Sequence, residues 1–520
     1  MFPEPEYHHH EEYRNRLAKI AEIRALGVDP YPHHYTPTAH AEQLLKEYEN
    51  QPVGHSEDAA AGTTPQVTVA GRLILFRSMG KNAFGHVKDE TGKIQFMCNR
   101  ELTVVNGLSS SEEMTPMKFI EKKIDLGDII GIEGNLFRTQ KGELTIFVKR
   151  LTLLCKTLLP LPDKHSGLAD KGVRYRKRWL DLITNPESTT ILLMRSRIVQ
   201  IVRAYFEAEG FIEVETPVLQ NVYGGAAARP FATHLHALDQ EMFLRISLEI
   251  PLKKLIAGGL GKVFEMSKVF RNEGIDRTHN PEFTELEAYA AYWDYNDTMR
   301  LMENLFETIA LKLFNTTKIL AFKDDKFIEI DLKTPWKRMS MVDSIRTYAN
   351  IDVDKLSDDQ MRHLLQDKVE SATLRKATRG AMIALLFEEF AEEHLIQPHH
   401  IIDHPIETTP LCKLHRDPAL AAQGFVERFE TFILGGEYSN AYTELNDPVL
   451  QRKLLEDQAT QRASGNVEAS PLDEEFIEAI CQGMPPASGI GMGIDRLVML
   501  FTQAQSIRDV LYFPLMKPEE

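Results

Sequence analysis

Residues 270–289 read FRNEGIDRTHNPEFTELEAY, a stretch in which charges of both signs surround an Asn-Pro pair. The segments KVFEMSKVF before the loop and FTELEAYAAY after it have the apolar alternation that is typical of β-strands. Between them, RNEGIDRTHNPE is polar and contains Gly274 and Pro281, which favour a loop. This part of the sequence therefore predicts two strands joined by a long polar loop.

Side chains of this hairpin can act together on one ligand. Successive residues of a strand point to opposite faces, so Arg271 and Glu273, two residues apart, share a face. Phe283, beyond the Asn280-Pro281 corner, can lie flat over a planar group. The alternative is a surface hairpin with ordinary ion pairs, because exposed charge pairs are common and contribute little.

A second segment favours the binding site over the surface hairpin. The sequence ASGIGMGIDRLVMLF (487–501) is a glycine-rich approach to an apolar helix with Arg496 in its first turn. Such glycines permit close approach of a ligand, and a helix start favours negative charge, although helix packing also explains the glycines. Together with the acidic strand positions Glu430 and Glu437, the pattern predicts an ATP site. Arginines would bind its phosphates, carboxylates its Mg²⁺ and an aromatic ring its adenine.

The composition limits the class of protein. A chain of 520 residues is too long for one ordinary core, so we expect two or three domains. No apolar run is long enough to span a bilayer and the polar N-terminus has no signal-peptide core, so we expect a cytoplasmic protein without a membrane partner. The four cysteines are far apart and form no CxxC pair, so neither zinc nor a disulfide framework is expected.

The charge distribution is uneven. The net charge of −16 argues against diffuse attraction of nucleic acid to the whole surface. Residues 138–178, however, hold eleven Lys and Arg against three Asp and Glu, which makes this stretch about +8. A solvated basic face is the alternative to a nucleic-acid contact, and charge alone does not separate the two.

Changes of pattern divide the chain into parts. Residues 1–65 predict a helical extension and linker, and residues 66–155 alternate apolar and polar residues over about five strands with one helix between the third and fourth. Five such strands predict an OB-fold barrel, which commonly binds single-stranded nucleic acid; an SH3-like or other small barrel is the alternative. A basic hinge at 156–178 precedes a mixed domain at 179–520, in which about 338–397 predicts a helical insertion.

Three segments occur in the order of a known family. FRNEGIDRTHNPEFT resembles motif 2 of the class II aminoacyl-tRNA synthetases, GFIEVETPVL resembles motif 1, and GIGMGIDRLVMLF resembles motif 3. The barrel resembles the N-terminal anticodon-binding domain of the lysyl, aspartyl and asparaginyl subgroup. Within it, the chain is most similar to lysyl-tRNA synthetases of the bacterial type, on the segments GGAAARPF, RISLEIPLK and NAYTELND. The resemblance covers about residues 10–517.

The resemblance implies a fold and a reaction. The fold class is α+β, with a five-stranded OB-fold barrel joined to a catalytic domain built on an antiparallel sheet flanked by helices. The implied aminoacyl-tRNA ligase activates L-lysine with ATP to lysyl-adenylate, releases pyrophosphate and passes lysine to the 3′ end of lysine tRNA. It would use several Mg²⁺ ions. A homodimer is implied through the motif 1 helix region, whose apolar stripe runs from Ile191 to Tyr205.

The same resemblance assigns the residues of the site. Arg271 would bridge the lysine carboxylate and the α-phosphate, and Arg496 would bind the γ-phosphate, so these two are the catalytic residues. The other ATP contacts are assigned to Glu273, His279 and Phe283, and Mg²⁺ to Glu430 and Glu437. Lysine is assigned to Gly225, Glu249, Arg271, Glu287, Tyr289, Asn440, Tyr442 and Glu444.

The residue types also support a lysine pocket. An ammonium group taken out of water needs carboxylate partners, which Glu287 and Glu444 can supply. Asn440, Tyr442 and Glu444 recur with strand period two, so all three can face one pocket, and Tyr289 shares a face with Glu287. A pocket that binds aspartate would need a cation at the positions of Glu287 and Glu444. The alternative is that these carboxylates belong to a structural core network.

Two positions depart from the family pattern. Some members have a second loop arginine immediately before the histidine, where this chain has Thr278 with Arg277 one residue earlier, so the γ-phosphate contact of the loop stays open. Ala441 replaces a frequent glycine and narrows the pocket. The rival functions are an aspartyl- or asparaginyl-tRNA synthetase, a non-catalytic tRNA-binding paralogue and a paralogue that lysylates protein. The last two are disfavoured because the ATP-site residues and the barrel are all present.

Four residues of the barrel match the anticodon-reading positions of the subgroup, namely Arg77, Phe84, Gln95 and Glu143. An unstacked anticodon base needs an aromatic platform and neighbours that form hydrogen bonds, and this set supplies both. The alternative is that Phe84 belongs to the barrel core, as most aromatic residues of strands do.

Overall fold

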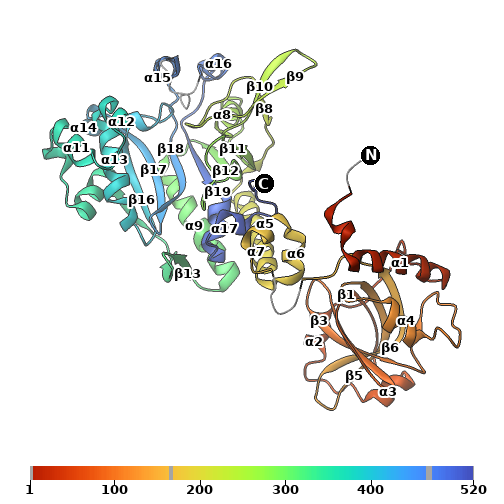
Figure 1. The fold of residues 1–520 in the computed structure, drawn as a ribbon. Helices are drawn as coiled ribbons and strands as arrows, with labels where there is room; N and C mark the ends of the chain where they lie inside the picture. The colour runs from red at the N-terminus through yellow and green to blue at the C-terminus, as the bar shows by residue number, and fades with distance from the viewer. Residues whose placement is uncertain (1–3, 163–167, 464–470, 519–520) are drawn as a thin grey trace. The chain divides into compact units, whose positions relative to one another are not determined.

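The computed structural model describes residues 4–162, 168–463 and 471–518. The chain forms two compact units, Met1–Gly167 and Leu168–Glu520, and the division between them falls inside the predicted hinge at 156–178. Figure 1 labels the helices and strands. Among the described residues, no helix combines the length and the apolar character that crossing a membrane requires.

The first unit contains a closed five-stranded barrel, as the alternation of its sequence predicted. The ring runs β3-β2-β1-β5-β6, and a parallel pairing of β3 with β6 closes it. A Cβ at Gly85 would lie 2.3 Å from the ring of Phe96, so only glycine fits at this place in the barrel wall. The elements are β1 (Gln66–Met79), β2 (Asn82–Lys88), β3 (Lys93–Asn99), β4 (Val104–Val105), α4 (Pro116–Lys123), β5 (Ile129–Arg138) and β6 (Leu144–Cys155).

The N-terminal segment packs on this barrel, whereas the sequence suggested an appended extension and linker. Ile23 and Leu44 belong to the barrel core. The buried Arg16 guanidinium donates to the Leu126 carbonyl at 3.2 Å and to Thr157 Oγ1 at 2.9 Å. The segment is therefore a structural part of the first unit. Its helices are η1 (Glu6–His9), α1 (Glu11–Ala25), α2 (Ala41–Glu47) and α3 (Ser56–Ala61).

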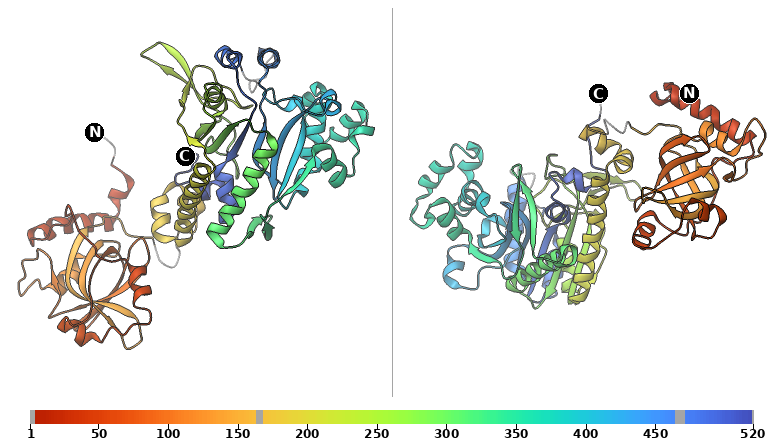
Figure 2. Two further views of the ribbon diagram at one scale, coloured as in Figure 1. Left: turned by 180° about the vertical axis from the view of Figure 1, so that it is seen from behind. Right: turned by 90° about the horizontal axis from the view of Figure 1, so that it is seen from below.

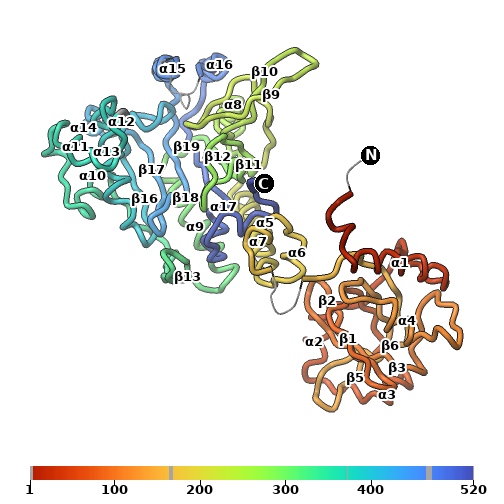
Figure 3. Tube along the Cα trace, viewed as in Figure 1, coloured from red at the N-terminus to blue at the C-terminus, as the bar shows by residue number. Residues whose placement is uncertain are grey.

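The second unit is built on an eight-stranded sheet in the order β15-β16-β17-β18-β19-β12-β11-β7. Neighbouring strands are antiparallel except at the two edges, where β7 with β11 and β15 with β16 are parallel. β12 and β19 lie side by side although they are far apart in the sequence (Figure 3). The strands are β7 (Ile212–Glu213), β11 (Lys262–Phe270), β12 (Glu282–Ala291), β15 (Lys337–Ser340), β16 (His399–Pro405), β17 (Phe425–Ile433), β18 (Gly436–Thr443) and β19 (Ala487–Gly493).

β11 and β12 form the predicted hairpin. Their pairing runs from Lys262 opposite Ala290 to Phe270 opposite Glu282, which leaves residues 271–281 as the loop. The sequence FIEVETPVL (211–219) predicts a strand that is stopped by Pro217, and this prediction is wrong in extent, because the strand pairing with β11 covers Ile212–Glu213 and both residues are exposed.

Helices cover one face of this sheet. α7 (Pro186–Ala208), α9 (Tyr295–Phe314) and α17 (Ile494–Thr502) supply a core with alternate residues of the central strands. In the view from behind, α7 and α9 lie side by side over the sheet (Figure 2). The other helices outside the insertion are α5 (Lys171–Arg176), α6 (Arg178–Thr184), α8 (Glu249–Ala257), α14 (Pro418–Ala422), α15 (Pro448–Ala463), α16 (Glu474–Cys481) and α18 (Ile507–Val510).

Smaller elements surround the sheet. The region predicted as a helical insertion has its own core, in which Met361, Leu386 and Phe387 are buried. Its helices are α10 (Met341–Ser344), η2 (Ile345–Ala349), η3 (Val353–Lys355), α11 (Asp358–Leu365), α12 (Ser371–Lys376), α13 (Arg379–Phe390) and η4 (Glu392–His394). The remaining elements are β8 (Leu219–Gln220), β9 (Ala232–Leu235), β10 (Gln240–Leu244), β13 (Lys318–Lys323), β14 (Lys326–Asp331) and η5 (Ile406–Thr408).

The basic stretch is not a continuous solvated face. Lys156 is buried and its Nζ lies 2.7 Å from Asp128. Arg174 and Arg178 contact the buried Asp181 at 2.7 and 2.6 Å. These cations are neutralised inside their own units, so the charge of the sequence overstates the charge of the surface.

Candidate active site

A cavity of about 640 Å³ opens on the face of the sheet opposite α9. Strand alternation produces it, because Leu286 and Ala288 of β12 face the helix-covered core while Glu285 and Glu287 line the cavity. Every residue of the second unit that the sequence assigned to a site lines this cavity except Glu444. These residues are Gly225, Glu249, Arg271, Glu273, His279, Phe283, Glu287, Tyr289, Glu430, Glu437, Asn440, Tyr442 and Arg496.

The two assigned arginines are held from different elements. Arg271, at the end of β11, donates from Nε to the Ile246 carbonyl at 3.1 Å, and its guanidinium lies 5.0 Å from the centre of the Phe283 ring. Arg496, in the first turn of α17, donates to the Glu437 carbonyl at 2.8 Å and lies 3.2 Å from Nε2 of His279. A planar base can therefore lie near Phe283 while anionic groups contact both guanidiniums.

The hairpin loop offers histidine and not Arg277 to the cavity. Thr278 and His279 line the cavity, and Asp276 Oδ2 lies 2.8 Å from His279 Nδ1. The side chain of Arg277 is exposed and does not line the cavity, whereas its carbonyl accepts a hydrogen bond from the Ile507 amide at 2.7 Å. In this conformation Arg277 therefore does not replace the missing loop arginine.

Glu430 and Glu437 form a carboxylate pair in the part of the cavity where Arg496 lies. Burial and the neighbouring Glu430 raise the pKa of Glu437, although Arg496 acts in the opposite direction. Arg428 contacts Glu430 at 2.6 Å and donates to Asn440 Oδ1 at 3.0 Å. The Asn440 amide is thus engaged on this side of the cavity. Two carboxylates that repel one another fit a divalent cation, which prefers oxygen ligands.

Glu287 lies at the other end of the cavity among hydrogen-bond donors. Its Oε1 accepts from Ser247 Oγ and the Leu248 amide, both at 2.7 Å, and its Oε2 accepts from the Tyr289 hydroxyl at 2.8 Å. Burial, together with nearby Glu285 and Glu249, raises the pKa of Glu287 to about 8. An ammonium group in this place would favour the ionised carboxylate.

Glu444 differs from the expectation. Its carboxylate is buried behind the cavity wall, and Oε2 lies 2.5 Å from Nζ of Lys253, a partner from the chain itself. Burial raises the pKa of Glu444 to about 8 even though Lys253 acts in the opposite direction.

A Cβ at Gly489 would lie 2.2 Å from the Tyr289 ring and 2.3 Å from Glu444 Oε1, so glycine is required there.

The α-amino end of the predicted pocket is built by close backbone approach. Gly225 has φ +86°, and a Cβ there would lie 2.6 Å from Ser247 Oγ. Glu249, the first residue of α8, accepts from the Tyr442 hydroxyl at 2.5 Å. Gly225, Ser247 and Glu249 therefore meet at one point of the cavity.

Sequence reasoning missed three charged residues of this region. Glu285 lines the cavity 3.5 Å from Arg271, and its Oε2 has no hydrogen-bond partner among the residues that the structure describes. Its place between Phe283 and Glu287 on one strand face was a usable signal. Arg428 stands in the same relation to Glu430 but lies outside the segments that carry the resemblance, whereas Lys253 follows Glu249 by four residues on α8 and ends the segment RISLEIPLK.

The barrel residues assigned to the anticodon share the outer face of the barrel. Phe84 is half-buried and packs on a small cluster containing Met97, outside the main barrel core. Glu143 accepts from Gln95 Nε2 at 2.8 Å and lies 3.0 Å from His86 Nε2. Arg77 is exposed and pairs across the strands with Phe84. His86, which sequence reasoning missed, belongs to this polar group.

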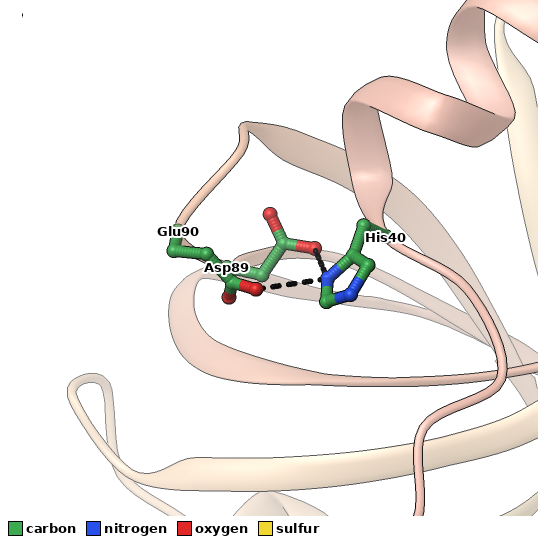
Figure 4. A group of neighbouring side chains, drawn as sticks. All are labelled: His40, Asp89 and Glu90. Carbon is green, nitrogen blue, oxygen red and sulfur yellow. Dashed lines mark ion pairs between the residues drawn. The ribbon is translucent and has the colours of Figure 1, made fainter. Parts of the chain in front are cut away.

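A separate group in the first unit is structural (Figure 4). His40 Nδ1 lies 2.9 Å from Glu90 Oε1 and 3.7 Å from Asp89 Oδ2. Asp89 already accepts from the Ala41 amide at 2.8 Å and from Thr91 and Gly92 of its own turn. The group therefore joins the start of α2 to the turn between β2 and β3.

Comparison with known proteins identifies both units. The family model for "tRNA synthetases class II (D, K and N)" matches residues 170–517, and that for "OB-fold nucleic acid binding domain" matches residues 67–154. A relative named "Lysine--tRNA ligase" from Chlamydia pneumoniae is 54% identical over 99% of this chain and 98% of its own length. Relatives of the same name from Listeria innocua and Nostoc punctiforme are each 43% identical, over 98% and 97% of this chain and 98% and 87% of their own lengths.

Proposed function

The chain belongs to the class II tRNA synthetases of the D, K and N group, and we propose that it activates L-lysine with ATP and transfers the lysyl group to the 3′ end of lysine tRNA. The carboxylates Glu249 and Glu287, which line the same cavity as Arg271 and Arg496, carry this proposal. Two carboxylates suit the two ammonium groups of lysine, whereas aspartate and asparagine have the α-ammonium group alone and would leave one carboxylate without a partner. Because tRNA charging serves translation, we place the activity in the cytoplasm.

The residues of the site perform the reaction by position and charge. Arg271 lines the cavity between the Ile246 carbonyl and Glu285, where it can contact both the lysine carboxylate and the α-phosphate. Arg496 and His279 would meet the outer phosphates, and Phe283 the adenine. The attacking carboxylate is already ionised and needs no base, so orientation and charge stabilisation supply the acceleration.

Divalent cations fit the carboxylate pair described above. Glu430 and Glu437 would hold Mg²⁺, which supplies charge neutralisation for the phosphates when bound. Arg428 fixes Glu430 at 2.6 Å and so keeps the pair in place beside Arg496. Glu273 lines the cavity near the loop, where it can contact the nucleotide.

Amino-acid-dependent exchange of pyrophosphate into ATP tests the proposal. Purified protein should catalyse exchange with lysine, and aspartate and asparagine offered separately should give no exchange above background. Exchange driven by aspartate or asparagine would assign the chain to another branch of the same family.

Lysine binding is expected to release protons below pH 8. Glu287 and Glu444 have pKa values of about 8 in the free site, and an ammonium partner would lower them. The dissociation constant for lysine should therefore fall as pH rises from 6 to 8, by up to about tenfold per pH unit for each proton released. Calorimetry in buffers of different ionisation enthalpy measures the number of protons that are released for each lysine bound.

The same shifts affect stability with a defined sign. An unfolded glutamate loses its proton near its ordinary pKa of 4.5, whereas these folded groups keep theirs to about pH 8. The stability of the free protein should thus fall across this window, and lysine should raise the melting temperature most near pH 8. A lysine affinity that is constant from pH 6 to pH 8 would contradict the assignment.

We also propose a homodimer, on a surface other than the predicted stripe. Ile198 and Val202 of that stripe are buried in the chain's own core. The neighbouring Trp179, Leu193 and Phe513 are 56%, 61% and 76% exposed, which favours a contact surface near α7.

Sedimentation should give a dimer at micromolar concentration. Leu193→Arg should shift it to the monomer, because a charge in an apolar interface is costly. Val449→Arg, at a residue that is 79% exposed on α15, is the control and should remain a dimer. A wild-type monomer would rule out this assembly.

A further inference from the structure

Lys253 is a buried cation directly behind the predicted lysine pocket. It lies on α8 with 1% of its surface exposed. Its Nζ is 2.5 Å from Glu249 Oε1 and 2.5 Å from Glu444 Oε2. The rings of Tyr442 and Phe476 lie 5.2 and 5.9 Å from the same nitrogen. The ammonium is thus held by two carboxylates and two aromatic rings.

These contacts orient Glu249. Its Oε1 accepts hydrogen bonds from Lys253 Nζ and from the Tyr442 hydroxyl, and the hydroxyl oxygen also lies 2.5 Å away. The other oxygen, Oε2, is used by neither, and the residue lines the cavity. Glu249 therefore has one oxygen engaged by the chain and one available to a ligand. Although burial acts to lower the pKa of Lys253, the two carboxylates raise it above its ordinary value, so Lys253 stays charged.

The charges of this region are balanced for a ligand with two positive groups. Glu249, Glu287 and Glu444 carry three negative charges when ionised, and Lys253 neutralises one of them. The further carboxylate of this face, Glu285, lies 3.5 Å from Arg271 and is balanced there. Two uncompensated negative charges remain, and free lysine brings an α-ammonium and an ε-ammonium group.

We propose that Lys253 is a positioning and specificity-determining residue, which orients Glu249 and sets the charge of the pocket to match an amino acid with two ammonium groups. The inference rests on the proposed lysine activation. A purely structural role explains the arrangement less well, because a buried ion pair contributes little net stability compared with apolar residues of similar volume. The buried ammonium of Lys253 is better explained by its effect on the charge of the pocket.

Calorimetric titration of lysine into the full-length protein tests this, with Lys253→Met as the main variant. Without Lys253 the carboxylates gain protons that lysine must displace. We expect about tenfold weaker lysine affinity at pH 7, at least partial recovery at pH 8.5, and more protons released per lysine bound than in the wild type. ATP affinity without lysine should not change. The matched control is Lys254→Met, because Lys254 is the next residue on α8 but faces Asp473 and Glu475, away from the cavity. This variant should bind lysine as the wild type does.

A double variant separates charge balance from folding. Lys253→Met combined with Glu444→Gln removes one charge of each sign, so the net charge of the pocket stays the same as in the wild type. It should bind lysine more tightly at pH 7 than Lys253→Met alone, with proton release near the wild-type value. If the two substitutions instead weaken lysine affinity independently, so that the double variant binds more weakly than Lys253→Met alone, the proposal is overturned.

The remaining outcomes are also decisive. If Lys253→Met lowers the melting temperature but keeps wild-type lysine affinity and proton release, or if neither variant folds, Lys253 serves the fold only and the proposal falls. If the wild type itself does not bind lysine, the proposed function fails, which is a different result from failure of the variants alone.

Discussion

Replacing Arg496 with alanine should lower lysine-dependent pyrophosphate exchange by about 10²- to 10³-fold, the usual loss when one fixed donor to transition-state charge is removed. Arg496 reaches the cavity from the first turn of α17 and is fixed by the Glu437 carbonyl at 2.8 Å and by contact with His279. Charge shifts onto the leaving pyrophosphate in the transition state, so the loss should appear in kcat as well as in KM for ATP.

Arg277→Ala is the matched control for this experiment. Arg277 lies in the loop that carries His279, but its side chain is exposed and does not line the cavity. Exchange by this variant should stay within about threefold of the wild type, and both variants should keep the wild-type melting temperature. Near-normal exchange by Arg496→Ala would remove this arginine from the ATP site. A loss of similar size in Arg277→Ala would mean that the loop rearranges to bring Arg277 to the phosphates.

The sequence predicted those parts of the fold that have a regular period. The alternation of 262–270 and 282–291 predicted β11 and β12, and the predicted face that Glu287 shares with Tyr289 lines the cavity. The barrel followed for the same reason. The strand at β7 was predicted too long, since Ile212 and Glu213 are exposed and their edge pairing with β11, which defines the strand, has no periodic signal in the sequence.

Charge partners were the least predictable feature of the site. Glu444 has the strand period of Tyr442, and this suggested a direct contact with substrate, yet Lys253 of α8 lies against its carboxylate. The partner comes from a helix that is almost 200 positions away in the sequence, and no local pattern reports such a contact. The same holds for Asp128, which lies 28 residues before Lys156 and neutralises part of the basic stretch that composition counted as positive.

The second large prediction concerns the barrel, because Phe84 belongs to the first unit and the residues that line the cavity belong to the second. Phe84→Ala should lower aminoacylation of lysine tRNA by between about 5- and 150-fold, the equivalent of 1–3 kcal/mol of stacking on one base. The half-buried ring lies on the outer barrel face, where it pairs across the strands with the exposed Arg77. Lysine-dependent pyrophosphate exchange needs no tRNA and should keep its wild-type rate.

Phe76→Ala provides the comparison that separates recognition from packing. Phe76 is also half-buried, but it packs against the main barrel core and stacks on Phe96 with ring centres 6.5 Å apart. It should lower the melting temperature more than Phe84→Ala does, since Phe84 packs on the small cluster with Met97 and not on the main barrel core. At a temperature where both variants are folded, Phe84→Ala should have the larger defect in tRNA charging. If the two defects instead follow the losses of stability, Phe84 acts through packing and the anticodon contact must lie elsewhere on the barrel.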